Sequence, residues 1–293
     1  MKKTIIKTLK KSVPDSAKKA LKRILALEIG LDVCEMDLLT QQQAFVTKKT
    51  EAHQLRGLIN KLSPVIDEDR SLIRLGPNGD GGYLVPDDLT GIAACFSPGV
   101  AFVSGFEKDC ANLGMKVFLA DNSIEKPVEN HELFHFTKKH VGAISNDDFM
   151  TMDDWVASSL PDDHSDLLLQ MDIEFSEYET ILRMSDALLQ RYRIIVAEFH
   201  ELDQLWSLPF YELASHAFEK ILQTHHCVHI HPNNCCGSMQ KDGLDIPGVM
   251  EFTFLRRDRL QNPRPAKGFP HPLDYPNTKN PPLILPKCWY EFD

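Results

Sequence analysis

Two short segments of uniformly apolar residues constrain the fold of this chain more than any other feature. They are DLLLQMDI (166–173) and RIIVAEF (193–199), and each has the length of a β-strand. A strand covered by helices on both faces loses the alternation of polar and apolar residues and becomes apolar nearly throughout. These segments therefore predict parallel strands buried in the centre of an α/β sheet.

Further strands and helices alternate with these two from about residue 70 onwards. Strands are predicted at 91–98, 116–120, 134–143, 227–231 and 249–255. Helices are predicted at 102–113, 151–160, 176–190 and 209–224, with Ser176 and Glu179 as a capping box for the third. A βαβ order of this length predicts an open, twisted and mostly parallel sheet.

The N-terminal residues differ from this pattern. Residues 1–30 form a predicted basic arm, because residues 1–25 carry nine lysines and arginines against Asp15 alone. Apolar residues at positions 17, 20, 21, 24 and 25 recur at helical spacing, which predicts an amphipathic helix. Such a helix either lies on an anionic membrane surface or packs on the body or on a second subunit, so an oligomer is left open.

Two further parts complete the predicted domain organisation. Residues 31–69 form a helical neck or cap, with a helix at 36–62 that ends before Ser63-Pro64. Residues 70–293 hold the α/β domain. Its proline-rich C-terminal segment contains many large apolar residues, so we expect that segment to wrap around the body.

The composition excludes several classes of protein. The formal net charge is −10 in spite of the basic arm, so the body repels polyanions and no nucleic-acid partner is expected. No run of eighteen apolar residues is present, which predicts no membrane span. The N-terminus lacks the apolar core of a secretory signal, and the seven cysteines contain no CxxC pair. We expect a cytoplasmic protein with reduced thiols, with peripheral membrane contact through the arm left open.

In an open α/β sheet, ligands bind at the carboxyl ends of the strands, and this rule selects the candidate functional residues. Those at the predicted strand ends are Ser97, Pro98, Gly99, Asp121, Gly142, Asp172, Glu174, Glu198, His200, His229 and His231. The stretch 78–83 has three glycines in four positions, which favours unusual backbone angles or close approach to a ligand. It predicts a tight hairpin at the edge of the site.

The segment DLLLQMDIEFSEYETIL (166–182) resembles the strand–turn–helix signature of the FkbM-type S-adenosylmethionine-dependent methyltransferase family, which usually reads D-x-E-G-x-E. The order of elements over about residues 70–260 is similar to that of class I methyltransferases. Two positions depart from the family pattern: Phe175 stands where the family has glycine, and SPGV at 97–100 replaces a G-x-G loop. The resemblance implies a Rossmann-like α/β fold, with N-terminal helices and a mostly parallel seven-stranded sheet that has an antiparallel late strand.

The resemblance also implies an activity. It predicts transfer of a methyl group from S-adenosylmethionine to a hydroxyl, on a sugar, a glycan or another small-molecule acceptor. The alternative is a Rossmann-like module of another kind, either an enzyme with a nucleotide cofactor or an assembly protein of a glycan pathway. The lack of a G-x-G-x-x-G loop argues against a nicotinamide cofactor.

The methyl donor is expected at the ends of the first two strands of the sheet. Gly99 lets backbone N–H groups approach the methionine carboxylate, and Pro98 stiffens the turn. Asp121 is suited to accept hydrogen bonds from both ribose hydroxyls, although the same carboxylate could cap its own loop. The residues predicted to bind the cofactor are Ser97, Pro98, Gly99, Asp121, Asn122 and Gly142.

The predicted catalytic residues are Asp172, Glu174 and His200. Asp172 and Glu174 are two residues apart, so on an extended backbone both side chains point to one side. Two adjacent carboxylates predict a general base or half of a divalent-metal site, unless Glu174 pairs with an arginine or caps the next helix. His200 is either a general base or a hydrogen-bonded structural histidine.

The acceptor is predicted to contact a separate set of residues, which are Asp80, Tyr83, His229, His231 and Asn233. His229 and His231 share one face of a predicted strand, where they either ligate a metal together with Asp172 and His200 or pack as polar side chains. A divalent metal cofactor is left open, and no residue is assigned as a ligand.

Overall fold

The computed structural model describes residues 47–67, 70–100, 103–161 and 164–291. These residues fall into a small unit, described at 47–50 and 207–209, and a large unit made of 51–206 and 210–293. In the small unit, the backbone N–H of Leu208 donates to the carbonyl of Lys48. The predicted basic arm and the first part of the predicted neck lie outside the described residues.

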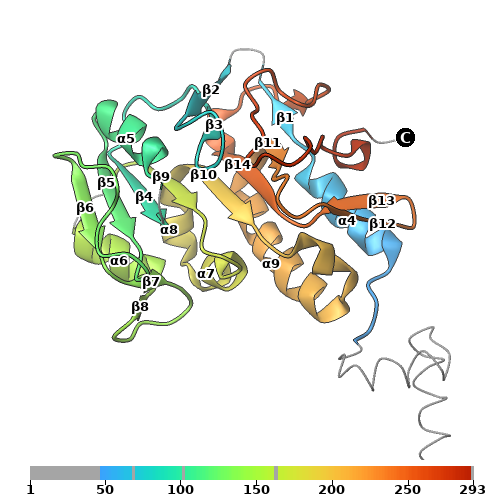
Figure 1. The fold of residues 1–293 in the computed structure, drawn as a ribbon, viewed down its shortest axis with the longest axis horizontal. Coiled ribbons are helices and arrows are strands. Elements are labelled where there is room, and N and C mark those ends of the chain that lie inside the picture. The colour runs from blue at the N-terminus through green and yellow to red at the C-terminus, as the bar shows by residue number, and fades with distance from the viewer. Residues whose placement is uncertain (1–46, 68–69, 101–102, 162–163, 292–293) are drawn as a thin grey trace, which may run out of the picture. The chain divides into compact units, whose positions relative to one another are not determined.

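A seven-stranded sheet forms the centre of the large unit (Figure 1). Its strands are β4 (Ala94–Pro98), β5 (Lys116–Ala120), β6 (Phe134–Thr137), β9 (Leu167–Met171), β10 (Tyr192–Phe199), β11 (His225–Pro232) and β14 (Met250–Arg256). They lie in the order β11-β14-β10-β9-β4-β5-β6. Both pairings of β14 are antiparallel and the other pairings in the sheet are parallel. The predicted sheet, mostly parallel with one antiparallel late strand, is confirmed.

Helices cover both faces of this sheet. They are α4 (Ala52–Leu62), α5 (Gly105–Asn112), α6 (Met152–Ser159), α7 (Glu177–Arg183), α8 (Asp186–Arg191) and α9 (Leu208–Thr224). On one face, α4 and α6 to α9 bury residues such as Trp155 and Phe218 against the strands. On the other face, α5 buries Phe106 and Cys110. Burial on both faces explains why the central strands are apolar nearly throughout.

Four pairs of short strands surround the sheet. They are β1 (Val65–Ile66) with β15 (Arg264–Pro265), β2 (Leu72–Leu75) with β3 (Tyr83–Pro86), β7 (His140–Val141) with β8 (Phe149–Met150), and β12 (Ser238–Lys241) with β13 (Leu244–Pro247). Three 3-10 helices span Leu202–Trp206, Arg257–Arg259 and Lys287–Trp289. The glycine-rich stretch joins β2 to β3, so the hairpin itself is confirmed, and its position at the edge of the site stays a prediction.

Three predicted elements differ most from the structure in their extent. The predicted helix at 176–190 is two helices, because Met184 leaves the helical conformation and the side chain of Ser185 caps α8 by accepting from the N–H of Leu188. Ser176 makes no side-chain capping bond, so the predicted capping box is wrong. The predicted strand at 134–143 is divided between β6 and β7. In the described part of the predicted neck, the helix begins only at Ala52.

Two expectations about the rest of the chain can also be compared with the structure. Leu285 and Trp289 of the C-terminal segment are buried in the core. Cys235 and Cys236 are joined by a disulfide between neighbouring residues, whereas the scattered cysteines predicted reduced thiols. Among the described residues, no helix combines the length and the apolar character needed to cross a membrane.

Candidate active site

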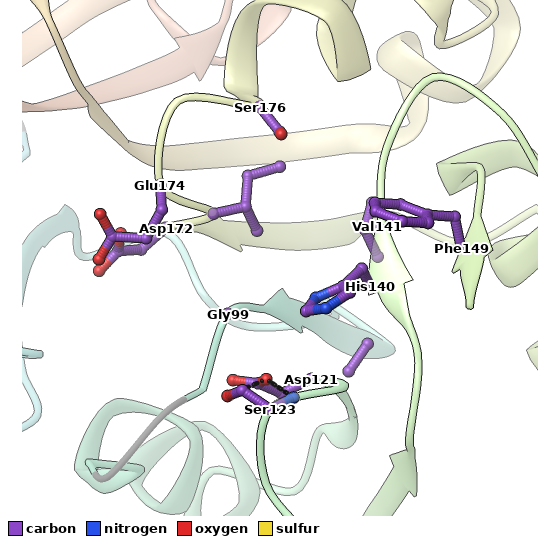
Figure 2. Close-up of a pocket in the computed structure, with 11 residues that line it drawn as sticks. Gly99, Asp121, Ser123, His140, Val141, Phe149, Asp172, Glu174 and Ser176 are labelled. Carbon is purple, nitrogen blue, oxygen red and sulfur yellow. Dashed lines mark hydrogen bonds between the residues drawn. The ribbon is translucent and has the colours of Figure 1, made fainter.

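Three neighbouring parallel strands, β5, β4 and β9, end around one cavity. Gly99, Asp121 and Asp172, predicted to lie at these ends, all line it, so the structure brings them together. Its volume of about 410 Å³ lies in the range of small-molecule sites. In Figure 2, Asp121 lies on one side of the cavity, and Asp172 and Glu174 lie on another. The lining residues are Gly99, Ala120, Asp121, Ser123, His140, Val141, Phe149, Asp172, Ile173, Glu174 and Ser176.

The turn after β4 requires glycine. Gly99 has a φ of 87°, which lies in the left-handed region that favours glycine. A Cβ at this position would lie 1.6 Å from the carbonyl oxygen of Asp172, so no other residue fits without displacing the turn after β9. The N–H of Gly99 donates to the carbonyl of Ala120 at 2.9 Å. The ends of β4, β5 and β9 are therefore held together at the floor of the cavity.

The carboxylate after β5 is held by its own loop. Oδ1 of Asp121 accepts from the backbone N–H of Ser123 at 2.7 Å and from the hydroxyl of the same residue at 2.6 Å. Asp121 is buried, yet it lines the cavity. The loop cap considered from the sequence is thus present, and it fixes the carboxylate at the edge of the cavity.

The turn after β9 lies in the segment that resembles the FkbM-type signature, and Phe175 is its main departure from that pattern. Glu174 and Phe175 have φ values of 53° and 84°, both in the left-handed region. The family's usual glycine would adopt this conformation without strain, whereas a residue with a Cβ pays an energetic penalty there. The ring of Phe175 stacks on Phe210 at a centroid distance of 5.9 Å and meets the edge of Tyr178 at 6.0 Å. These contacts offset part of the strain.

His200 follows β10 and stands among four carboxylates. Its Nδ1 is 3.2 Å from Oε1 of Glu177, and its Nε2 is 3.3 Å from Oε1 of Glu198. Nε2 is also 3.8 Å from Oδ1 of Asp172 and 3.6 Å from Oε2 of Glu174. The side chain of Glu177 is fully buried, and that of Glu174 is 88% exposed. The structure therefore brings all three predicted catalytic residues together.

This surrounding charge changes the protonation of both His200 and Asp172. Burial alone would lower the pKa of His200, but hydrogen bonds and charge interactions with Glu177 and Glu198 outweigh it and raise the pKa to about 11. Burial raises the pKa of Asp172 above its ordinary value, and the charge of Glu198 adds to the increase. A protonated imidazole cannot accept a proton. In this arrangement His200 is therefore a cation between carboxylates and not a general base.

A second polar cluster lies farther along the same edge of the sheet. Glu251 on β14 is the direct neighbour of Glu198 on β10 and of His231 on β11. The C-terminal segment contributes Asp274, which lies 2.9 Å from Nε2 of His229 and 3.7 Å from Nδ1 of His231. Burial alone would raise the pKa of Asp274, but its bonds to the two histidines lower it below its usual range.

The residues predicted to bind the acceptor lie in or near this second cluster. Asn233 donates to both carboxylate oxygens of Glu198 at 3.3 Å. Tyr83 is buried, and its hydroxyl accepts from Gln170 at 3.4 Å. Burial raises the pKa of Asp80, and the charge of Glu198 adds to this increase. His229 and His231 are paired with the C-terminal segment as described above, so a role in acceptor binding stays a prediction for all five residues.

Four residues predicted to bind the cofactor do not line the cavity, namely Ser97, Pro98, Asn122 and Gly142. Ser97 is completely buried and its hydroxyl contacts Oε1 of Glu107 and Oε1 of Gln170, each at 2.6 Å. The other three are sequence neighbours of residues that do line it. A role of these four residues in cofactor binding stays a prediction.

Several residues of the site are not among those predicted from the sequence. His140, Val141 and Phe149 line the cavity from the β7–β8 pair, and Ser123 lines it beside Asp121. Asn277 donates to Oε1 of Glu251 at 2.6 Å from the C-terminal segment. Ser123 belongs to the loop cap of Asp121 considered from the sequence. No local pattern marks the other residues, because they reach the site through contacts between segments that are far apart in the chain.

Comparisons with known proteins place the chain in no established group. No model of a known protein family matches it. No curated protein matches it either. One solved structure, assigned as a methyltransferase from an antibiotic biosynthesis pathway of Anabaena variabilis, shares 14% identity over 48% of this chain and 60% of its own length, with a TM-score of 0.25. A match of this extent carries no argument about activity, which rests on the residues of the chain itself.

Proposed function

We propose that this chain is an S-adenosylmethionine-dependent methyltransferase that methylates a hydroxyl oxygen, with a sugar or glycan as the acceptor. One observation carries the proposal: Gly99, Asp121 and Asp172, selected from the sequence as the cofactor and catalytic strand ends, line one cavity of about 410 Å³. The class I methyltransferase fold implied by the resemblance also has the type of sheet found in this chain.

The residues around the cavity fit the methyl donor. Gly99 lines the cavity, and its lack of a side chain lets the turn after β4 pack against the turn after β9, where a Cβ would collide. Asp121 offers a fixed carboxylate at the end of the second strand, where ribose hydroxyls are bound in α/β sheets. Asp172 and Glu174 lie together on one side of the cavity. Negative charge on their carboxylates would favour the positive sulfonium of the donor on that side.

When bound, S-adenosylmethionine supplies a methyl group that passes to the acceptor oxygen, while sulfur keeps the electron pair of the broken C–S bond and becomes a neutral thioether. The chain's own residues position the two reactants in line and exclude water, which supplies much of the acceleration. The hydroxyl proton passes to a carboxylate of Asp172 or Glu174. His200 is already protonated, so we assign it to holding these carboxylates in place rather than to accepting the proton.

Ligand-induced thermal stabilisation tests the proposal. S-adenosylmethionine and S-adenosylhomocysteine should each raise the melting temperature by several degrees, because a ligand at one hundred times its dissociation constant adds about 2.7 kcal/mol. Asp121→Asn should weaken both by roughly tenfold or more through the loss of charge-assisted hydrogen bonds. The exposed Asp147 lines no part of the cavity, so Asp147→Asn is the matched control.

The outcomes separate the proposal from its alternative. Stabilisation by NAD without any response to the adenosyl compounds would favour an enzyme with a nicotinamide cofactor. No response to any nucleotide would favour an assembly protein. The basic arm lies outside the described residues, so membrane contact through it remains a separate prediction.

A further inference from the structure

We infer that Asp172, Glu174 and His200 form a binding site for one divalent metal ion at the carboxyl ends of β9 and β10. Each residue offers one ligand atom, and the three atoms lie within 4.8 Å of one another. The role of such an ion toward an acceptor hydroxyl would rest on the function proposed above, whereas its binding can be tested without that function.

The spacing of the three ligand atoms suits a metal ion. Nε2 of His200 is 3.8 Å from Oδ1 of Asp172 and 3.6 Å from Oε2 of Glu174. Protein ligands to first-row ions lie about 2.0–2.2 Å from the metal, which separates ligand atoms by roughly 3 to 4 Å. Glu174 adopts the left-handed conformation in the turn after β9, and its carboxylate lies beside that of Asp172, as Figure 2 shows. Small side-chain adjustments would therefore suffice for coordination.

A second observation points to a missing partner at this place. Oδ1 of Asp172, the oxygen nearest His200, is buried and has no hydrogen-bond partner. A buried carboxylate oxygen without a donor is costly unless a cation or proton satisfies it. In the part of the chain that the structure describes, His200 is the only basic side chain within ion-pair distance of Asp172, Glu174, Glu177 and Glu198. Four carboxylates thus share one imidazole, which leaves room for further positive charge.

Neighbouring residues support coordination by His200. Nδ1 lies 3.2 Å from the fully buried carboxylate of Glu177, and such a contact is the usual way that the second ring nitrogen of a ligand histidine is oriented. The ion would replace the proton that His200 carries in the metal-free chain, because metal binding at a histidine nitrogen releases a proton. Glu174 is largely exposed and lines the cavity, so positions on the ion would remain open to solvent or an acceptor. Two carboxylates and one imidazole favour ions such as Mn²⁺, Fe²⁺ or Zn²⁺.

Titration of the full chain with Mn²⁺ tests this inference, with bound ion measured by the loss of the free Mn²⁺ signal in electron paramagnetic resonance. We expect one ion per chain. Glu174→Gln and Asp172→Asn should each weaken binding by roughly tenfold or more. Glu179→Gln is the matched control, because Glu179 is an exposed carboxylate on α7 outside the cluster. Glu174 is exposed, so its variant should fold, which circular dichroism would verify.

Two results would overturn the inference: wild-type protein that binds no Mn²⁺, or Glu174→Gln protein that binds it as tightly as wild type. If an amino sugar raises the melting temperature and the protein binds no Mn²⁺, the carboxylates instead bind the ammonium group of that sugar. Binding of S-adenosylhomocysteine in the presence of EDTA is measured on the same samples. If the protein binds Mn²⁺ but does not bind S-adenosylhomocysteine, the proposed methyltransferase is refuted. If it binds S-adenosylhomocysteine but no Mn²⁺, the metal site is refuted.

Discussion

Two glycines with almost the same backbone conformation show how one residue shapes the cavity. Gly99 and Gly114 have φ values of 87° and 89°. A Cβ on Gly99 would meet the carbonyl oxygen of Asp172 at 1.6 Å, whereas a Cβ on Gly114 would meet nothing within 4 Å. The pair therefore separates the cost of the backbone conformation from the cost of closing the site.

We expect Gly114→Ala to lower the free energy of unfolding by about 1–2 kcal/mol, which is the cost of the left-handed conformation alone. Gly99→Ala should lower it by clearly more, because the turn after β9 must also move. Chemical denaturation of both variants measures the difference. Equal losses would contradict the view that Gly99 is required by contact between the two turns.

At the scale of an element, the turn between β9 and α7 combines strain with stacking. Phe175 is 45% exposed and has a φ of 84°. It stands at the position where the FkbM-type signature that the segment resembles has glycine. Its ring contacts with Phe210 and Tyr178 help keep an aromatic residue in this conformation. At this position the backbone conformation lowers the stability of the fold and the ring contacts raise it.

Replacing Phe175 by alanine or by glycine removes the ring in both cases and leaves only the backbone difference. We expect Phe175→Gly to be at least as stable as Phe175→Ala, by up to about 1 kcal/mol, because glycine adopts a positive φ without strain. The exposed helical position Glu179 should show the opposite order, with alanine more stable than glycine by about 1 kcal/mol. The same order at both positions, measured by urea denaturation, would refute a strained turn.

At the scale of the whole molecule, carboxyl groups paired with arginines and carboxyl groups that are fully buried act oppositely on stability. Burial alone would raise the pKa of Asp166, but hydrogen bonds from Arg256 and Arg193 lower it below the ordinary value. Stability from Asp166 is therefore present above its unfolded pKa near 3.8 and is lost as the pH falls further. Burial raises the pKa of Glu107 to about 7 and that of Glu251 to about 8. Their contribution is present below about pH 4.5 and is lost as the pH rises through the folded pKa.

These signs predict a melting temperature that is highest near pH 5 and falls toward pH 8. Glu107→Gln should reduce the fall, because ionising this buried carboxyl costs roughly 3 kcal/mol at most. The exposed Glu132→Gln is the control and should leave the profile unchanged. Scanning calorimetry at pH 5 and pH 8 measures both, and an unchanged fall in Glu107→Gln would show that Glu107 does not titrate in this range.

The sequence by itself determined the strands of the sheet and the residues at their ends. The strand at 116–120 matches β5, and DLLLQMDI contains β9, because burial on both faces leaves a local pattern that needs no knowledge of the rest of the chain. The position of Gly99, Asp121 and Asp172 at one edge followed from parallel order alone. These features are local, so short segments suffice to predict them.

Only the tertiary structure decided which polar groups meet and what protonation they hold. Asp274 and Asn277 come from a segment whose sequence indicates only wrapping, yet they complete the second cluster beside Glu251. The pKa of His200 depends on Glu177 and Glu198, which reach it from different elements. The Met184–Ser185 break between α7 and α8 also escaped prediction. Charge interactions and burial depend on distances through space, and a linear sequence does not contain those distances.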